Sequence, residues 1–241
     1  MYSTVLAALD VQMSIGARDN KEETIRSNVI GTLNLTDVCY LKGIHITVFA
    51  TGCIYTYNDE HPIGGPGFLE TDPANFAGSF YSETKAHVEE VMKTYKNALI
   101  LRLRMPMPVS DDLHSRNFVT KIAKYDRVVD IPNSNTILHD LLPASILLAE
   151  HKETGIYNFT NPGAISHNEV LALFKEYVRP DFTWKNFTLE EQSKVIKAGR
   201  SNCKLDTTKL VNKLAEYGYE VPEIHEAYKG CFQRMAAAGT K

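Results

Sequence analysis

The sequence has few cysteines and no long apolar run, and both shortages limit the kind of protein it encodes. Its four cysteines, in a chain of 241 residues, form no C-x-x-C pair or other metal-ligand spacing. We therefore expect no metal site and a reducing compartment. No stretch approaches the roughly 18 uninterrupted apolar residues that a transmembrane helix needs. The formal net charge of -3 argues against binding to nucleic acid or to anionic membranes.

The first residues also lack a targeting pattern. Residues 1–11 have neither the basic start nor the small-residue cleavage site of a secretory signal, which indicates a soluble, cytoplasmic protein. On that interpretation the N-x-[ST] sequons at Asn34, Asn158 and Asn186 are chance matches.

The distribution of apolar residues, prolines and glycines predicts alternating helices and strands in the first half. Residues 3–9 fit either a short strand or the start of a helix. The elements expected after them are a loop over 14–20, a helix from Lys21 to a cap at Gly43, a strand over 44–50, a loop over 56–79, a helix over 81–96 and a strand over 98–104. This alternation predicts an α/β fold with a partial, Rossmann-like, doubly wound parallel sheet.

The second half predicts more helix than strand. A capping box at Ser166 and Glu169 marks the start of one helix. The elements expected are helices over 117–125, 139–151, 166–178, 188–195, 205–216 and 222–237, and strands over 128–131 and 155–160. We therefore divide the chain into a truncated Rossmann-like core, residues 1–130, and a smaller, mainly helical substrate lobe with one returning strand, residues 131–241.

Tyr81 and Lys85 are the first candidates for chemistry. They lie four residues apart at the start of a predicted helix, so they share one helix face. A neighbouring ammonium stabilises a phenolate, which makes the tyrosine a usable proton donor or acceptor nearer neutral pH. Taken alone, the pair is equally typical of a solvent-exposed helix face. Its position after a buried strand that ends in Thr51 and Gly52 favours a site, because ligands collect beyond strand carboxyl ends.

Several motifs together resemble the extended short-chain dehydrogenase/reductase superfamily. Within it, residues 21–229 are similar to the bifunctional 3,5-epimerase/4-reductases that convert UDP-4-keto-6-deoxyglucose to UDP-rhamnose. The motifs are Phe49-Ala50-Thr51-Gly52-Cys53-Ile54-Tyr55, Gly78-Ser79-Phe80-Tyr81-Ser82-Glu83-Thr84-Lys85, Leu103-Arg104-Met105-Pro106, Arg116-Asn117-Phe118-Val119-Thr120-Lys121, Asn158-Phe159-Thr160-Asn161-Pro162-Gly163 and Gly199-Arg200-Ser201-Asn202.

The resemblance implies a catalytic role for each of five residues. Tyr81 would protonate the C4 oxygen during reduction, Lys85 would support it and grip the nicotinamide ribose, and Thr51 would hydrogen-bond the reacting oxygen. Cys53 would be the base and Lys121 the acid of epimerisation. The alternatives are a strand-end threonine, a small buried cysteine and a solvated lysine. No carboxylate follows Thr51, which favours an epimerase/reductase over a sugar dehydratase.

The resemblance also implies ligands. The cofactor would be NADPH or NADH, bound in part by Tyr81, Lys85, Thr51 and Met105. The substrate would be a UDP-sugar held by Asn117, Arg200 and Asn202, and arginine suits the diphosphate because of its bidentate geometry. Asn28 resembles the superfamily's helix asparagine near the lysine; a surface asparagine is the alternative. No nucleic acid or membrane partner is expected, and a homodimer is compatible with the sequence.

One feature of the superfamily is missing from residues 1–20. They contain no G-x-x-G-x-x-G turn between a strand and a helix, the element that holds a dinucleotide pyrophosphate. We therefore expect this chain alone to bind NAD(P) weakly or not at all. The alternative hypotheses are a truncated, inactive member that acts only as an interaction partner, and a reductase for another carbonyl. Calorimetry with NADPH separates the enzyme from the inactive fragment.

Overall fold

The computed structural model describes residues 4–7, 20–107, 118–125, 127–195 and 199–239. Four parallel strands form its main sheet in the order β1-β2-β3-β5. They are β1 (Thr4–Ala7), β2 (His45–Thr51), β3 (Ala98–Leu103) and β5 (Gly155–Asn158). The segment that fitted a strand or a helix start is thus the strand β1, with Thr4 opposite His45. The predicted parallel sheet is confirmed.

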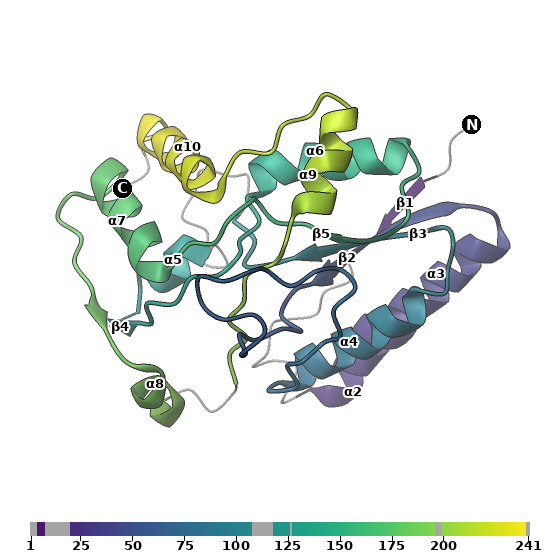
Figure 1. Ribbon diagram of the computed structural model, residues 1–241, viewed down its shortest axis with the longest axis horizontal. Coiled ribbons are helices and arrows are strands. Elements are labelled where there is room, and N and C mark those ends of the chain that lie inside the picture. The colour runs from purple at the N-terminus through teal and green to yellow at the C-terminus, as the bar shows by residue number, and fades with distance from the viewer. Residues whose placement is uncertain (1–3, 8–19, 108–117, 126, 196–198, 240–241) are drawn as a thin grey trace.

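One face of the sheet is covered by the helices that precede and follow β2. The first is continuous through α2 (Lys21–Thr24), the π-helical turn η1 (Ile25–Gly31) and α3 (Thr32–Leu41); the second is α4 (Phe80–Met92). The first helix ends just before Gly43, whose φ of 63° is the left-handed conformation that glycine adopts without strain at a helix end. Figure 1 shows this helical layer beneath the sheet.

The other face carries α6 (Leu138–Glu150) and α9 (Thr208–Glu216). Alternate residues of β3 face the two layers: Ala98 and Ile100 pack toward α3 and α4, whereas Leu99 and Leu101 pack toward α6 and α9. All four are at most 1% exposed, so the sheet is buried on both sides. The fold is therefore α/β and doubly wound, as the alternation of elements predicts.

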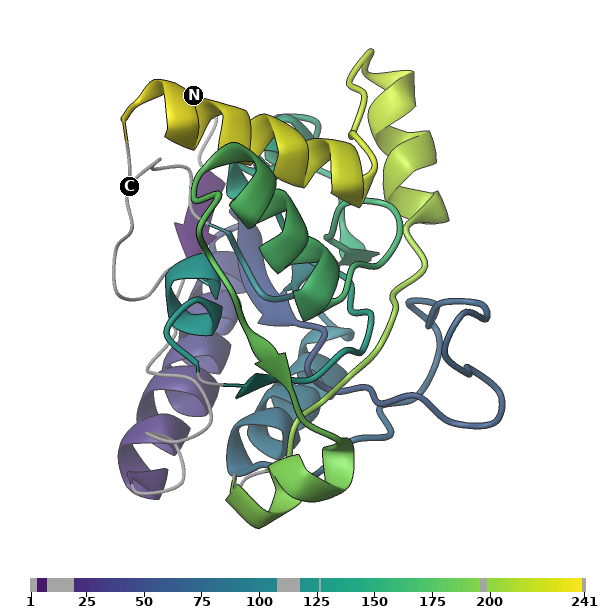
Figure 2. The ribbon, with the colours of Figure 1, turned by 90° about the vertical axis from the view of Figure 1, so that its left-hand side faces the viewer.

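A second apolar cluster lies at the end of the sheet and joins mainly helical segments (Figures 1 and 2). One of these helices, α7, begins after Ser166, which caps it through the predicted capping box with Glu169. The elements of this end are α5 (Phe118–Ile122), β4 (Arg127–Val128), α7 (His167–Tyr177), β6 (Lys185–Asn186), α8 (Leu189–Val195) and α10 (Ile224–Ala237). The division of the chain at residue 130 stays a prediction.

The predicted loop over residues 56–79 contains no helix, and its Pro and Gly content explains why. It is anchored at Phe68, which bridges to Leu205 and stacks on Tyr55 with ring centroids 4.5 Å apart. In the part of the chain that the structure describes, no helix is long and apolar enough to cross a bilayer. Most of the predicted loop over 14–20 lies outside the described residues.

Candidate active site

Thr51 and Cys53 stand at the carboxyl end of β2, a central strand of the sheet. The Thr51 side chain is 6% exposed, and its Oγ1 accepts a hydrogen bond from the Cys53 backbone N–H at 3.1 Å. The same hydroxyl also has one hydrogen, which it can donate to a ligand oxygen. Gly52 between them packs closely against Leu205, since a Cβ there would lie 2.7 Å from Leu205 Cδ1 and the leucine side chain would have to shift.

Tyr81 and Lys85 occupy the first two turns of α4, which starts after the loop that follows β2. The helix packs back along β2, so its first turn lies at the strand end that carries Thr51. Ser79 caps this helix by accepting the Ser82 N–H at 3.1 Å, which fixes the first turn. Tyr81 and Lys85 are 8% and 7% exposed, so they do not form the solvent-exposed face that the alternative interpretation requires.

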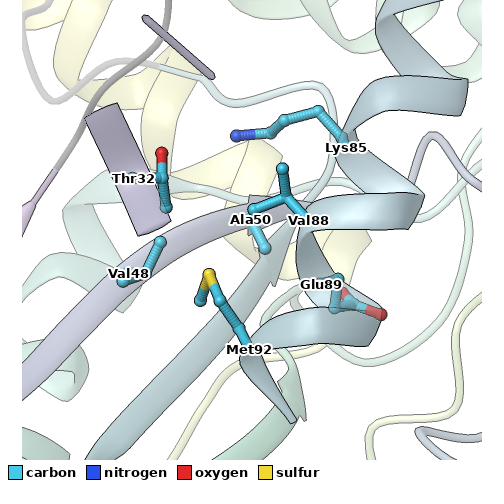
Figure 3. Close-up of a pocket in the computed structure, with 7 residues that line it drawn as sticks. All are labelled: Thr32, Val48, Ala50, Lys85, Val88, Glu89 and Met92. Atoms are coloured by element: carbon cyan, nitrogen blue, oxygen red, sulfur yellow. The ribbon is translucent and has the colours of Figure 1, made fainter. Parts of the chain in front are cut away.

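Lys85 borders a small cavity between α4, α3 and β2. The cavity measures about 10 Å³, near the lower limit for one water molecule, and Figure 3 shows the lysine amine pointing toward Thr32. Its other lining residues are Val48, Ala50, Val88, Glu89 and Met92. The charged end of Lys85 is thus held inside the protein, beside the strand that leads to Thr51.

Asn28 is fully buried within the π-helical turn η1, which packs against α4. A π-turn inserts an extra residue per turn into a helix and occurs often at functional sites. The surface location considered for Asn28 is therefore wrong. The structure places this amide on the helix beside the one that carries Lys85.

Arg104 brings the cysteine into contact with the second half of the chain. It follows β3, is 1% exposed, and donates from Nη1 to Cys53 Sγ at 3.2 Å and to Ser201 Oγ at 2.9 Å. Its Nη2 donates to the Ser201 carbonyl oxygen at 2.6 Å and to Asn133 Oδ1. Burial alone would lower the pKa of Arg104, but the thiols of Cys203 and Cys53 raise it above its ordinary value.

His167 links the acid candidate to the same region. Its ring lies 5.4 Å from that of Phe118, which is one helical turn from Lys121 on α5. Burial lowers the pKa of His167 to about 4, and the positive charges of Arg104 and Arg200 add to this effect. The structure therefore brings α5, the start of α7, Arg104 and Arg200 into one neighbourhood.

The pKa of His167 predicts an acid-sensitive fold. The pKa of His167 is about 4 in the folded chain and 6.5 ordinarily. Between these two pH values the unfolded chain therefore binds a proton at His167 that the folded chain does not bind. Stability should fall as pH drops from about 6.5 to 4, by up to about 3 kcal/mol. Urea unfolding at pH 7.5 and pH 5 measures this. His167→Asn should flatten the dependence, and an unchanged slope would contradict the assignment.

The substrate candidates are placed unequally. Arg200 is exposed, and Asn202 is half-buried and accepts from Asn133 Nδ2 at 3.0 Å through its Oδ1. Asn133 also contacts Arg104, so Asn202 is linked through Asn133 to the arginine that contacts Cys53. Asn117 lies outside the described residues. Met105 follows β3 with φ 41°, a left-handed conformation that costs a non-glycine residue about 1–2 kcal/mol and that is found often at functional sites.

Sequence reasoning assigned no role to four residues of this cluster: Arg104, Asn133, Ser201 and His167. One signal for Arg104 was available, because two arginines, at positions 102 and 104, stand in an otherwise apolar strand sequence. A buried arginine requires partners, but the sequence does not say which ones. Among the described residues, no group of three or more His, Cys, Asp or Glu side chains is placed to hold a metal ion.

Comparison with known proteins finds a matching family model and several similar proteins. The profile of the NAD dependent epimerase/dehydratase family matches residues 4–123. A bifunctional dTDP-4-dehydrorhamnose 3,5-epimerase/dTDP-4-dehydrorhamnose reductase from Arabidopsis thaliana is 59% identical over 198 residues, which are 82% of this chain and 65% of that protein. A trifunctional UDP-glucose 4,6-dehydratase/UDP-4-keto-6-deoxy-D-glucose 3,5-epimerase/UDP-4-keto-L-rhamnose-reductase from the same plant is 56% identical, over 82% of this chain and 29% of that protein.

A solved structure is similar over most of the chain. The L780 UDP-rhamnose synthase from Acanthamoeba polyphaga mimivirus superimposes with a TM-score of 0.80 at 38% identity, covering 87% of this chain and 71% of that one. The chain thus spans about two thirds of the length of one plant relative and under a third of the other.

Proposed function

Because the chain belongs to the NAD-dependent epimerase/dehydratase family, within the extended short-chain dehydrogenases/reductases, we propose that it acts on a 4-keto nucleotide sugar. The reaction is 3,5-epimerisation and 4-keto reduction of UDP-4-keto-6-deoxyglucose to UDP-rhamnose. The observation that carries this proposal is the carboxyl end of β2. There a hydroxyl donor, Thr51, and a thiol, Cys53, stand at the edge where α4 presents Tyr81 and Lys85.

The reductive step uses the helix pair and the strand-end threonine. When bound, a reduced nicotinamide, NADPH or NADH, supplies a hydride to C4. Tyr81 gives its phenolic proton to the C4 oxygen, and the buried ammonium of Lys85 stabilises the phenolate that remains. The Thr51 hydroxyl donates to the same oxygen as charge develops on it. Lys85 and Met105 border the nicotinamide end in this proposal.

The epimerisation step needs a base and an acid on opposite sides of the sugar ring. Cys53 removes the proton from C3 or C5, both α to the ketone, and the electron pair moves to the C4 oxygen held by Thr51 and Tyr81. Lys121 returns a proton to the other face of the carbon. A carboxylate at this position would favour dehydration chemistry. The thiol of Cys53 in its place therefore favours epimerisation.

The nucleotide half of the substrate is assigned mainly to the segment around Arg200 and Asn202, within the lobe. Arg200 is exposed, next to a segment fixed by Arg104, and its fork of donors fits a diphosphate. Asn202 and Asn117 complete the proposed UDP contacts. We place the activity in the cytoplasm, with no nucleic acid or membrane partner.

We propose a homodimer as the assembly. Large apolar side chains gather on the outer surface of the helices α3 and α4 and the turn before them, which is unusual for a solvent-facing layer. They are Ile25, Ile30, Val38, Tyr40, Leu41 and Val91, each at least 40% exposed.

Removing the Thr51 hydroxyl tests the proposed chemistry at its shared position. Thr51→Val keeps the branched shape but deletes the donor to the C4 oxygen, so we expect about 10²- to 10³-fold slower formation of UDP-rhamnose. The assay supplies UDP-4-keto-6-deoxyglucose and, because weak cofactor binding is expected, millimolar NADPH, and it follows the product by mass spectrometry. Thr94→Val, at an exposed position just after α4, is the matched control. An unimpaired Thr51→Val, with an active wild-type protein, would overturn the proposal.

A further inference from the structure

Two buried arginines, Arg102 in β3 and Arg104 just after it, have different surroundings. Arg102 is 1% exposed and forms a two-bond ion pair with Glu89, from Nε to Oε2 at 2.9 Å and from Nη2 to Oε1 at 2.6 Å. Arg104 is equally buried, yet in the described part of the chain no carboxylate contacts it. A buried charge without a counter-ion is costly, so Arg104 requires a negative partner.

The contacts of Arg104 leave one candidate for that partner. Asn133 and Ser201 offer neutral oxygens, which satisfy hydrogen bonds but not charge. Cys203 and Tyr57 are also near, but burial raises the pKa of the Cys203 thiol to about 11 and that of the Tyr57 phenol to about 12, so both stay protonated at neutral pH. Cys53 Sγ lies 3.2 Å from Nη1, within the distance of a charge-assisted hydrogen bond to sulfur. Cys53 is also partly exposed, as a base that meets substrate must be.

We propose that Arg104 is a positioning residue of the epimerisation step: its guanidinium holds Cys53 Sγ in place and stabilises that sulfur as the thiolate that accepts the proton from carbon. The inference rests on the proposed function, since only a substrate with an acidic C–H gives the thiolate its task. The balance is simple: the carbon proton moves to sulfur, the C–H electron pair moves to the ketone oxygen, and Lys121 reprotonates the carbon.

The remaining contacts of Arg104 link it to the segment that carries the proposed nucleotide contacts. Nη1 and Nη2 both bind Ser201, which lies between Arg200 and Asn202, the proposed nucleotide contacts. Ser201 Oγ in turn donates to the Tyr55 carbonyl oxygen at 2.6 Å, two residues after Cys53. The arginine therefore ties the nucleotide segment to the sulfur, so that bound nucleotide and base share one rigid support.

The test measures the thiol directly, without substrate. Iodoacetamide should alkylate Cys53 at pH 7 faster than it alkylates a cysteine in a short unstructured peptide, read by mass spectrometry of the Cys53 peptide. Cys39, Cys203 and Cys231 are buried and serve as slow internal references. Arg104→Gln should lower the alkylation rate of Cys53 at pH 7 about 10-fold or more, while Arg104→Lys should keep most of the reactivity.

Two outcomes would overturn the inference. One is a wild-type Cys53 that reacts at pH 7 no faster than a cysteine in a short unstructured peptide, which needs no variant and so stands even if Arg104→Gln does not fold. The other is equal reactivity of the wild-type protein and a folded Arg104→Gln. Deuterium exchange at C3 and C5 of the sugar separates a failure of this inference from a failure of the proposed function. If Cys53→Ser abolishes exchange but Arg104→Gln leaves the thiol reactivity unchanged, only the inference fails. If exchange survives Cys53→Ser, the proposed function fails.

Discussion

Replacing Cys53 with serine is expected to slow solvent deuterium incorporation at C3 and C5 of UDP-4-keto-6-deoxyglucose by about 10²- to 10⁴-fold, the usual contribution of a positioned general base. The hydroxyl is nearly the size of the thiol and still accepts from Arg104, so the structure around it should persist. What changes is basicity, because a serine hydroxyl does not ionise near neutral pH. NMR of the recovered sugar measures the deuterium at each carbon.

Cys39→Ala is the matched control for this prediction. Cys39 is 2% exposed in the core between α3 and the sheet, away from Cys53, and its substitution should leave the exchange rate essentially unchanged. Far-ultraviolet circular dichroism checks that both variants fold. Equal exchange in wild type and Cys53→Ser would remove the thiol from the mechanism and leave Cys53 as a small residue that fills space.

Breaking the buried pair of Arg102 and Glu89 is expected to lower the free energy of unfolding by about 3–5 kcal/mol. The side chains are 1% and 5% exposed, so Glu89→Gln leaves the guanidinium charge without a counter-ion in the interior. Arg102 also spans to the Asn158 Oδ1 of β5 and to the carbonyl oxygens of Leu69 and Glu70, so the loss reaches the long loop. Urea denaturation measures the change.

A surface pair on the same helix gives the comparison. Lys93 and Glu90 form an ion pair at 2.6 Å, but their side chains are 37% and 73% exposed, so Glu90→Gln should cost at most about 1 kcal/mol. The double variant Glu89→Leu with Arg102→Met, which removes both charges, should recover much of the loss. If Glu89→Gln and Glu90→Gln cost the same, the interior of the protein does not penalise the unpaired arginine as described.

Sequence alone could predict the elements in which burial follows a regular pattern from one end to the other. Along β3, alternate residues meet the two helical layers, and an apolar run of that length requires a buried strand. The glycine at position 43 and the capping box at Ser166 mark helix ends through local hydrogen bonds and dihedral angles. These features depend on residues close in sequence, so pattern rules reach them.

The parts that could not be predicted depend on distant contacts. Arg104 meets Ser201, which is 97 positions away, and Asn133, which is 29 away, and neither spacing follows from periodicity. The π-helical turn around Asn28 has nearly the same apolar pattern as an α-helix, so its extra residue is visible only in coordinates. The resemblance of the motifs predicted Thr51, Cys53, Tyr81 and Lys85 as site residues. The residues that contact and support them could be identified only in the folded structure.

The most direct test of the account is proton exchange catalysed by the wild-type chain in heavy water. The chain is incubated with UDP-4-keto-6-deoxyglucose without a nicotinamide cofactor, since removing and returning a carbon-bound proton consumes no hydride. The account predicts deuterium at both C3 and C5 of the recovered sugar, at a rate that Cys53→Ser suppresses. A folded wild-type protein that leaves both carbons fully protonated would contradict it.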